Sequence, residues 1–309
     1  MTALEQHLGE YLAVRRAMGY KLERAALLLA QFLAWLDEQD ASVITTELAL
    51  EWATLPPASA SNWQRQRLSA VRGFAAHLHA IDPAHAVPAA DLLAWRRRRH
   101  VPYLYGEEQI AALIAATSTL GSAHRAATLS TLIALLSVTG MRVGEAIRLD
   151  RADIDTVHEL LTVSDSKFGK SRELALHPTT ITALGRYLRR SDRPAAAAHT
   201  PPVFVSAAGT RLIYSNVQNT FSRLVDHAGL PARSPSCRPR LHDLRHSFAV
   251  TTLIDAYRHG EDVQARLALL STYLGHVNPA STYWYLQAAP ELMALAGQRL
   301  EQHLKGARA

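Results

Sequence analysis

Two stretches in the last third of the chain decide its interpretation. The first is Leu241-His242-Asp243-Leu244-Arg245-His246-Ser247-Phe248-Ala249, and the second runs from Tyr273-Leu274-Gly275-His276 to Ser281-Thr282-Tyr283-Trp284-Tyr285. Together they offer His242, His276, Arg245 and the late Tyr285, and Arg142 and Lys167 are available upstream. Cations, proton donors and one phenol are what chemistry at a phosphodiester requires. The two stretches therefore point to a reaction at phosphate.

Each of these residues, taken singly, has a plain structural explanation. A lone histidine usually packs in a core or at the surface, a lone arginine usually forms a salt bridge, and Tyr285 could pack with its aromatic neighbours. On a helix, however, His242 and Arg245 lie three residues apart and leave the same face. His276 follows a glycine at an expected helix end, where functional groups are often exposed. Order and spacing favour the functional interpretation.

Composition bounds the class of protein. The chain has 309 residues with 48% hydrophobic and 19% charged residues, which suits a folded protein of two domains. Its single cysteine, Cys237, cannot form an internal disulfide and suits a reducing compartment. The sequence contains no apolar run long enough for a membrane helix and no signal-peptide pattern. We expect a soluble, cytoplasmic, nucleoid-associated protein.

The positive charge is concentrated rather than spread. The formal net charge is +6, yet the first sixty residues hold four bases and eight acids. Residues 61–99 then hold seven arginines against two acids, Asp82 and Asp91. A surface that faces phosphates has this kind of distribution. The arginines expected to contact DNA are Arg65, Arg67, Arg72, Arg96, Arg97, Arg98 and Arg99.

The N-terminal part reads as four helices followed by a basic linker. In the helix that opens at Ser61 or Asn62, the apolar residues from Leu68 to Leu78 share one face, and Arg65, Arg67 and Arg72 are expected to lie away from it. This charged face either lies against DNA or is simply solvated. Four adjacent arginines before Pro102 mark the boundary between domains, as a linker crossing a phosphate backbone or as a merely solvated one.

The rest of the chain is expected to be α-rich with one small antiparallel β-hairpin. Residues 160–163 and 173–176 change to a strand-like pattern on either side of the turn Ser166-Lys167-Phe168-Gly169-Lys170-Ser171. Helices are expected over 126–138, 179–190, 216–228 and 291–304. The predicted organisation is a helical N-terminal domain at 1–98, a linker at 99–103, a second domain at 104–290, and a C-terminal helix at 291–309.

Two common cofactor patterns are not fulfilled. Gly169-Lys170-Ser171 resembles the end of a P-loop, but Ser164 stands where that motif requires its first glycine. His242 and His246 have the spacing of a helical zinc site, but Asp243 replaces the usual glutamate and Arg245 would place a cation beside the metal. We therefore expect neither ATP nor a metal ion as cofactor.

Six residues in order resemble the active-site pattern of the tyrosine recombinase (phage integrase) family, which includes the Xer and Cre types. They are Arg142, Lys167, His242, Arg245, His276 and Tyr285. The family's arginine segment is matched by Thr139-Gly140-Met141-Arg142-Val143-Gly144-Glu145, and its hairpin lysine by Lys167. Its His-x-x-Arg-His motif is found at His242–His246, its Leu-Gly-His motif at Leu274–His276, and its nucleophile, nine residues later, at Tyr285. The resemblance covers residues 104 to about 290. The N-terminal helices resemble the family's core-binding (SAM-like) domain without a diagnostic motif.

The resemblance implies the role of each residue. Tyr285 would attack the scissile phosphorus and form a 3′-phosphotyrosyl link, with His242 as general base or proton shuttle. Arg142 and Arg245 would bind the non-bridging oxygens, and His276 would donate to them. Lys167 would protonate the leaving 5′ oxygen. Glu145 would orient Arg142, and His246 would support Arg245. No ATP or metal would be needed, because the phosphotyrosine conserves the bond energy.

Several alternatives stay open. Lys170 competes with Lys167 for the minor groove and the general-acid role, and Tyr283 competes with Tyr285. The active unit would be a homotetramer on two DNA sites, possibly with accessory recombinases, and the C-terminal helix would pack on its own domain or dock on a neighbouring protomer. The cellular role would be integration of a mobile element or resolution of chromosome or plasmid dimers. A type IB topoisomerase-like relaxing enzyme and a catalytically silent DNA-binding factor are the less favoured classes.

Overall fold

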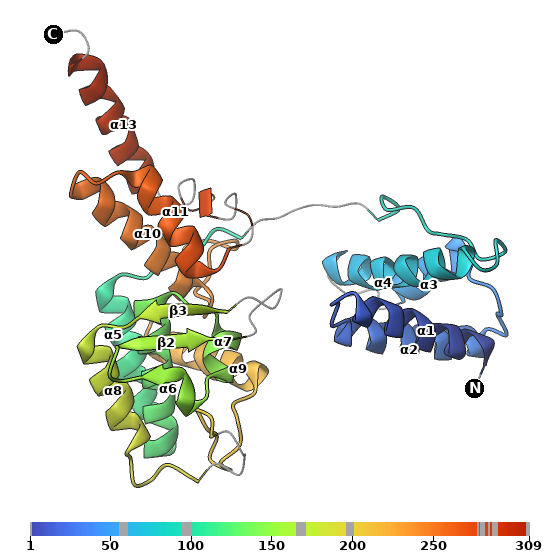
Figure 1. Cartoon of the computed structure of the whole chain (residues 1–309), viewed down its shortest axis with the longest axis horizontal. Helices are drawn as coiled ribbons and strands as arrows, with labels where there is room; N and C mark the ends of the chain where they lie inside the picture. The colour runs from blue at the N-terminus through green and yellow to red at the C-terminus, as the bar shows by residue number, and fades with distance from the viewer. Residues whose placement is uncertain are drawn as a thin grey trace. The chain divides into compact units, whose positions relative to one another are not determined.

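The computed structural model describes residues 2–55, 61–93, 100–164, 171–195, 201–276, 278, 282, 283, 285 and 290–306, and the account below is confined to them. The chain forms two compact units, residues 1–98 and residues 99–309, each of which is described by itself (Figure 1). Within the described ranges, no helix has the length and apolar character needed to span a bilayer.

The first unit is a bundle of four helices, as its sequence predicts. The helices are α1 (Ala3–Ala17), α2 (Glu23–Glu38), α3 (Thr46–Thr54) and α4 (Ser61–His79). Thr45 caps α3 by accepting a hydrogen bond from the backbone N–H of Leu48, at 3.2 Å. Phe32 lies at the centre of the core, with its ring centroid 5.0 Å from that of Trp52.

The expected exposure of Arg67 on α4 is wrong. Its side chain is buried, with 8% of the residue exposed, and its guanidinium lies 3.7 Å from the centre of the Trp52 ring. Nη2 donates a hydrogen bond of 2.6 Å to the carbonyl oxygen of Trp52 near the end of α3. A cation over an aromatic face that also satisfies a helix carbonyl is a packing element. The sequence pattern could not reveal this, because the partner lies on another helix.

The second unit is mainly helical, with one small sheet. Its N-terminal half consists of α5 (Glu107–Ala116), the 3₁₀ turns η1 (Thr117–Thr119) and η2 (Arg151–Asp153), α6 (Ala123–Thr139), α7 (Val143–Arg148), and strands β1 (Ile154–Asp155), β2 (Leu160–Val163) and β3 (Arg172–Ala175). Then follow α8 (Pro178–Leu188), α9 (Tyr214–His227), α10 (Asp243–Arg258), α11 (Val263–Leu274) and α13 (Pro290–Gly306).

The three strands form an antiparallel sheet in the order β1-β2-β3. β3 begins one residue earlier than the sequence indicates, because Arg172 pairs with Val163 across the ladder. Leu161, Val163 and Leu174 bury their side chains in the main core of the unit. The expected fold class, α-rich with a small antiparallel sheet, is confirmed.

The helices after the sheet form a second, smaller core. Residues of α10 and α11 pack there with Tyr285 and with Leu292 of α13. Figure 1 shows α13 running outward from α10 and α11 and ending far from the sheet. Arg258 of α10 donates to Glu291 at 2.7 Å, and Arg299 donates to the carbonyl oxygen of Glu261 at 2.8 Å. In the single chain, α13 therefore packs on its own unit.

Candidate active site

The turn between α6 and α7 positions Arg142. α6 ends at Gly140, whose φ of 58° is left-handed, and a Cβ at this position would collide with the Phe248 ring. Arg142 is the N-cap residue immediately before α7, and its side chain is part-buried. Nη2 donates to the carbonyl oxygen of Gly275 at 3.2 Å. The close packing of α6 on α10 thus requires glycine at 140 and fixes where Arg142 starts.

Glu145 joins two arginines that are far apart in the sequence. Its carboxylate accepts hydrogen bonds from the backbone N–H of Arg142 at 2.8 Å and from Arg142 Nη1 at 2.7 Å. Arg172, on β3, donates to the same carboxylate through Nη2 at 2.9 Å and Nη1 at 3.2 Å. Burial alone would raise the pKa of Glu145, but the hydrogen bonds and charges of Arg172 and Arg142 lower it to about 2. Glu145 is therefore ionised and holds both guanidinium groups in place.

Arg245 is the most deeply buried cation of the cluster. Its Nη1 donates to the carbonyl oxygen of Gly140 at 2.9 Å, and its Nη2 donates to that of Leu274 at 2.7 Å. Burial lowers the pKa of Arg245 to about 10, so the guanidinium remains charged at neutral pH. These two bonds tie α10 to the ends of α6 and α11, which carry Arg142 and His276.

Two histidines lie beside Arg245 at the start of α10. The rings of His242 and His246 are 4.9 Å apart and nearly perpendicular. His242 is exposed, yet partial loss of hydration and the charges of Arg245 and Arg240 lower its pKa to about 4. Solvent at its exposed edge moderates this fall without reversing it, so the ring is neutral at pH 7. Burial and His242 similarly lower the pKa of His246, to about 3.

His276 and Tyr285 complete the cluster. Gly275, with φ of 67°, ends α11 and turns the chain so that His276 Nδ1 lies 2.7 Å from the hydroxyl of the buried Thr282. The Tyr285 ring lies 6.0 Å from that of His276 and 5.3 Å from that of His246. Burial raises the pKa of Tyr285, while a hydrogen bond and charge from Arg245 oppose this.

The exposures of the two competing tyrosines differ sharply. Tyr285 is 2% exposed and contacts the cationic cluster, whereas Tyr283 is 49% exposed. In the single chain the phenol of Tyr285 is therefore placed against its own Arg245 and shielded from solvent.

The sequence profile described as the phage integrase family matches residues 104–291, more than half of the chain. The chain belongs to the phage integrase family. The expectation of a tyrosine-type site-specific recombinase is thereby confirmed.

Full-length relatives agree with this assignment. The candidate integrase/recombinase y4rB of Sinorhizobium fredii is 42% identical over 309 residues, covering 98% of each chain. Tyrosine recombinase XerC of Mycobacterium bovis is 30% identical over 300 residues, covering 94% of this chain and 95% of the relative. Among solved structures, the Tn1549 transposon integrase in complex with a circular intermediate DNA matches 97% of this chain and all of its own, at a TM-score of 0.64 and 16% identity. That likeness concerns the fold.

Some predicted site residues of this integrase-family chain lie outside the described residues. These are Lys167 and Lys170 in the segment 165–170, and Arg96 to Arg99 in the segment 94–99. Arg65 and Arg72 of α4 are half-buried and line a shallow pocket of about 340 Å³ together with Asn62, Gln66 and Ser69. The described cluster thus contains Arg142, Glu145, His242, Arg245, His246, His276 and Tyr285.

Sequence reasoning missed Arg172 and Thr282. Besides binding Glu145, Arg172 donates through Nε to the carbonyl oxygen of Tyr273 at 2.7 Å, so it connects β3 to the end of α11. One signal was available. Arg172 and Leu174 are two residues apart on a strand and therefore share its core-facing side, where a buried arginine requires an acidic partner. Thr282 gave no such signal, because its partner His276 becomes a neighbour only when the chain folds back.

Proposed function

We propose that this integrase-family protein cuts and rejoins duplex DNA at specific sites, through a 3′-phosphotyrosyl intermediate on Tyr285, in the service of a mobile element. The observation that carries the proposal is the contact of the Tyr285 phenol with Arg245, inside a cluster that also holds Arg142 and His276. Two fixed guanidinium groups beside a nucleophile form a site for the charge that develops on a phosphoryl group.

The attack requires removal of the phenol proton. Burial raises the pKa of Tyr285, so the phenol is protonated at neutral pH. The lowered pKa of His242 leaves its imidazole neutral and able to accept a proton. His242 is the proposed general base or shuttle, and the cationic neighbours that lower its pKa also stabilise the phenolate. Tyr285 oxygen bonds to phosphorus, and the 5′ oxygen leaves with a proton that we assign to Lys167.

The arginines and His276 would bind the non-bridging oxygens. Arg142 donates hydrogen bonds to Glu145 and to a backbone carbonyl, and Arg245 donates to backbone carbonyls. These contacts hold the guanidinium planes in place before DNA binds. With Thr282 as donor to Nδ1, the His276 ring carries its proton on Nε2 and can donate it to phosphate. Rejoining reverses these steps and conserves the energy of the phosphodiester.

Both units of the chain would contribute contacts to DNA. In the first unit, Arg65 and Arg72 line one polar pocket with Asn62, Gln66 and Ser69, and these groups suit contacts to sugar and phosphate. We propose that residues 1–98 form the core-binding domain, that residues 99–103 link it to the catalytic domain at 104–290, and that the basic residues of the linker and Lys170 add phosphate contacts. Arg67 is left out, because its guanidinium is committed to Trp52.

The assembled form would be a tetramer on two DNA sites, in which the segment 291–309 docks on a neighbouring protomer. In the single chain, α13 is held to α10 by the buried Leu292 and by exposed polar contacts, such as the pair of Arg258 and Glu291. Exposed ion pairs contribute little to stability, so exchange between protomers would cost little at these contacts.

The cellular role is proposed from the relatives. The higher identity, 42%, is to a chain described as an integrase/recombinase, which favours a mobile element. The 30% identity to a XerC protein over nearly the whole chain supports dimer resolution as the second candidate.

The decisive experiment uses nicked suicide duplexes from around the ends of the element that carries the gene. Wild type, Tyr285→Phe and Tyr283→Phe would be incubated with them and resolved on a denaturing gel. We expect a covalent protein–DNA band with wild type and Tyr283→Phe and none with Tyr285→Phe. A band that persists in Tyr285→Phe would assign the nucleophile elsewhere. Relaxation of supercoiled plasmid that lacks a specific site would favour a topoisomerase.

A further inference from the structure

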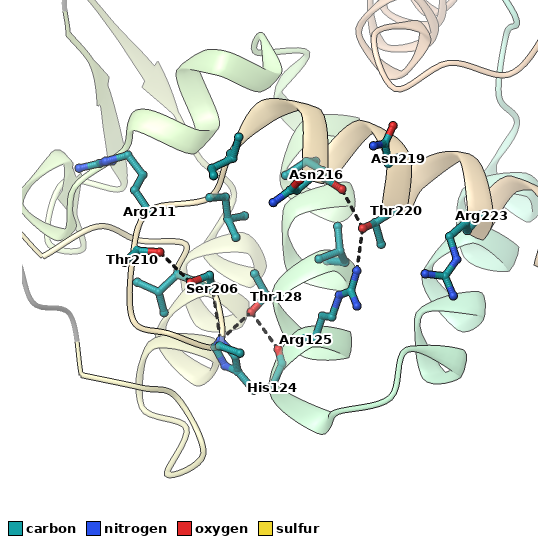
Figure 2. A pocket seen from close by; sticks show the side chains of 16 residues that line it. His124, Arg125, Thr128, Ser206, Thr210, Arg211, Asn216, Asn219, Thr220 and Arg223 are labelled. Atoms are coloured by element: carbon teal, nitrogen blue, oxygen red, sulfur yellow. Dashed lines mark hydrogen bonds between the residues drawn. The ribbon is translucent and has the colours of Figure 1, made fainter.

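A second polar pocket lies in the catalytic unit, apart from the cluster around Tyr285. It has a volume of about 460 Å³ and is enclosed by the start of α6, the segment 205–213 and one face of α9. Figure 2 shows Arg125 of α6 and Arg223 of α9 approaching it from two helices, with Asn216 and Asn219 along the α9 side. None of these residues belongs to the site proposed for phosphoryl transfer.

The pocket carries an excess of positive charge. Three arginines line it, and none of the described residues lining it is acidic. Arg211 is neutralised by Asp150, to which its Nη2 donates. Arg125 Nη2 donates to the hydroxyl of Thr220, at 2.9 Å. Arg223 is exposed and has no ion pair among the described residues. Within the part of the chain that the structure describes, Arg125 and Arg223 therefore have no acidic ion-pair partner.

The beginning of α9 adds partial positive charge at the same place. α9 has 14 residues, and within the described chain no side chain caps its N-terminus and no acidic residue lies in its first turn. Ile213, which precedes the helix, and Asn216, in its first turn, both line the pocket. Uncapped backbone N–H groups at a helix start favour an anion.

The opposite wall is rigid and polar. His124 is buried, and its Nε2 lies 3.1 Å from the carbonyl oxygen of Val205. Because a carbonyl oxygen can only accept, this contact places a proton on Nε2, and the buried Nδ1 has no hydrogen-bond partner among the described residues. The hydroxyl of Thr128 bridges His124 to the Tyr187 hydroxyl, at 3.0 Å from the latter. The wall is thus fixed before any ligand binds.

The pocket is also tied to the arginine that begins α7. Arg211 Nη1 donates to the carbonyl oxygens of Ile147 at 3.0 Å and Leu149 at 3.3 Å, at the C-terminal end of α7, the short helix whose N-cap is Arg142. Arg211 thus connects the pocket to α7, the helix that follows Arg142 of the catalytic cluster.

We propose that this pocket binds a phosphate group other than the scissile one, with Arg125 and Arg223 as its charged contacts and the start of α9 as its backbone contact. The group is either a phosphate of the DNA backbone or the phosphate of a free small molecule. The DNA-backbone form rests on the proposed function, whereas the binding of free phosphate does not depend on it.

The test measures the affinity for a short duplex as a function of salt. The proteins are wild type, Arg223→Gln, the double variant Arg125→Gln/Arg223→Gln, and Arg186→Gln, which removes one exposed charge of α8 outside the pocket. Loss of one phosphate contact lowers the slope of log affinity against log salt by about 0.9, which is about 3.5-fold in affinity between about 50 and about 200 mM salt.

If Arg125 and Arg223 contact one shared phosphate, the double variant should lose about 0.9 from the slope, whereas two separate phosphates would give a loss of about 1.8. Arg186→Gln should keep the wild-type slope. In parallel, inorganic phosphate is added to the DNA-free proteins, and their thermal unfolding is followed by circular dichroism. Phosphate that protects wild type but not the double variant, with unchanged DNA slopes, would assign the pocket to a free ligand and still support the proposal.

The proposal would be overturned if wild type and the pocket variants had equal slopes of log affinity against log salt and were equally protected by phosphate against thermal unfolding. It would also be overturned if Arg186→Gln lost as much slope as the pocket variants. Arg223→Gln keeps the test valid if loss of the Arg125–Thr220 contact unfolds the double variant. The covalent band on suicide duplexes, measured with the same preparations, separates failure of this proposal from failure of the proposed function.

Discussion

Replacing Glu145 with glutamine removes one negative charge from between two arginines without changing the shape of the side chain. Glu145 is 3% exposed and accepts hydrogen bonds from the guanidinium groups of both Arg142 and Arg172. In the variant, the amide NH₂ of glutamine would face arginine donors, so at least one acceptor position is lost. We expect Glu145→Gln to lower both the stability of the catalytic unit and the rate of DNA cleavage.

The size of the stability loss follows from the pKa. The pKa of Glu145 falls from 4.5 to about 2 on folding. This difference corresponds to about 3 kcal/mol of the free energy of unfolding at pH 7. Breaking a buried ion pair typically costs about 3–5 kcal/mol, which agrees. For a unit of this size, about 3 kcal/mol lowers Tm by about 6–12 °C.

The pH dependence provides the sharper assay. A depressed carboxyl pKa stabilises the fold above the unfolded-state pKa, and this contribution is lost as pH falls through the folded-state pKa. The difference in free energy of unfolding between wild type and Glu145→Gln should be full at pH 7 and shrink to about 1 kcal/mol at pH 3. Urea unfolding at both pH values measures it. Glu173→Gln, which removes an exposed carboxylate from β3, the strand that carries Arg172, is the matched control.

Two results would refute this reasoning. A gap between wild type and Glu145→Gln that does not change with pH would mean that the carboxylate charge is not what stabilises the fold. An unaltered rate of covalent band formation would mean that Arg142 does not depend on Glu145 for its orientation. A misplacement of about 1 Å at a catalytic group can cost about 10²-fold in rate, so the expected effect is large.

Three further outcomes are expected. Arg67→Gln should destabilise the first unit by about 1.5–3 kcal/mol, because the charged hydrogen bond to Trp52 is lost. It should leave the salt dependence of DNA affinity unchanged, whereas Arg72→Gln should reduce it. A reduced salt dependence in Arg67→Gln would contradict the structural role of Arg67. Thr282→Val should slow cleavage by about tenfold at unchanged DNA affinity, and a normal rate would show that the His276 tautomer is set otherwise. Deleting residues 291–309 should spare DNA binding and weaken assembly, and undiminished synapsis would count against docking on a neighbour.

Much of the fold could be predicted because it depends on local patterns. The helix that opens at Ser61 and the two hairpin strands follow from the period of their apolar residues, and the second strand lies at 172–175, one residue earlier than predicted. Gly140 and Gly275 indicated helix ends, because helices often end in a left-handed residue and glycine adopts that conformation most easily. Both glycines have a positive φ in the structure. Such features need only neighbouring residues to be decided.

The sequence also determined the family and the order of the chemically competent residues, since these are one-dimensional properties. Only the tertiary structure decided which side chains meet. Arg172 reaches Glu145, Thr282 reaches His276, and Arg67 turns into the core towards Trp52, because each partner is brought close by packing between separate elements. Ionisation was decided at the same level: a carboxylate or an imidazole has its pKa set by the charges and the loss of water around it, and neither exists until the chain has folded.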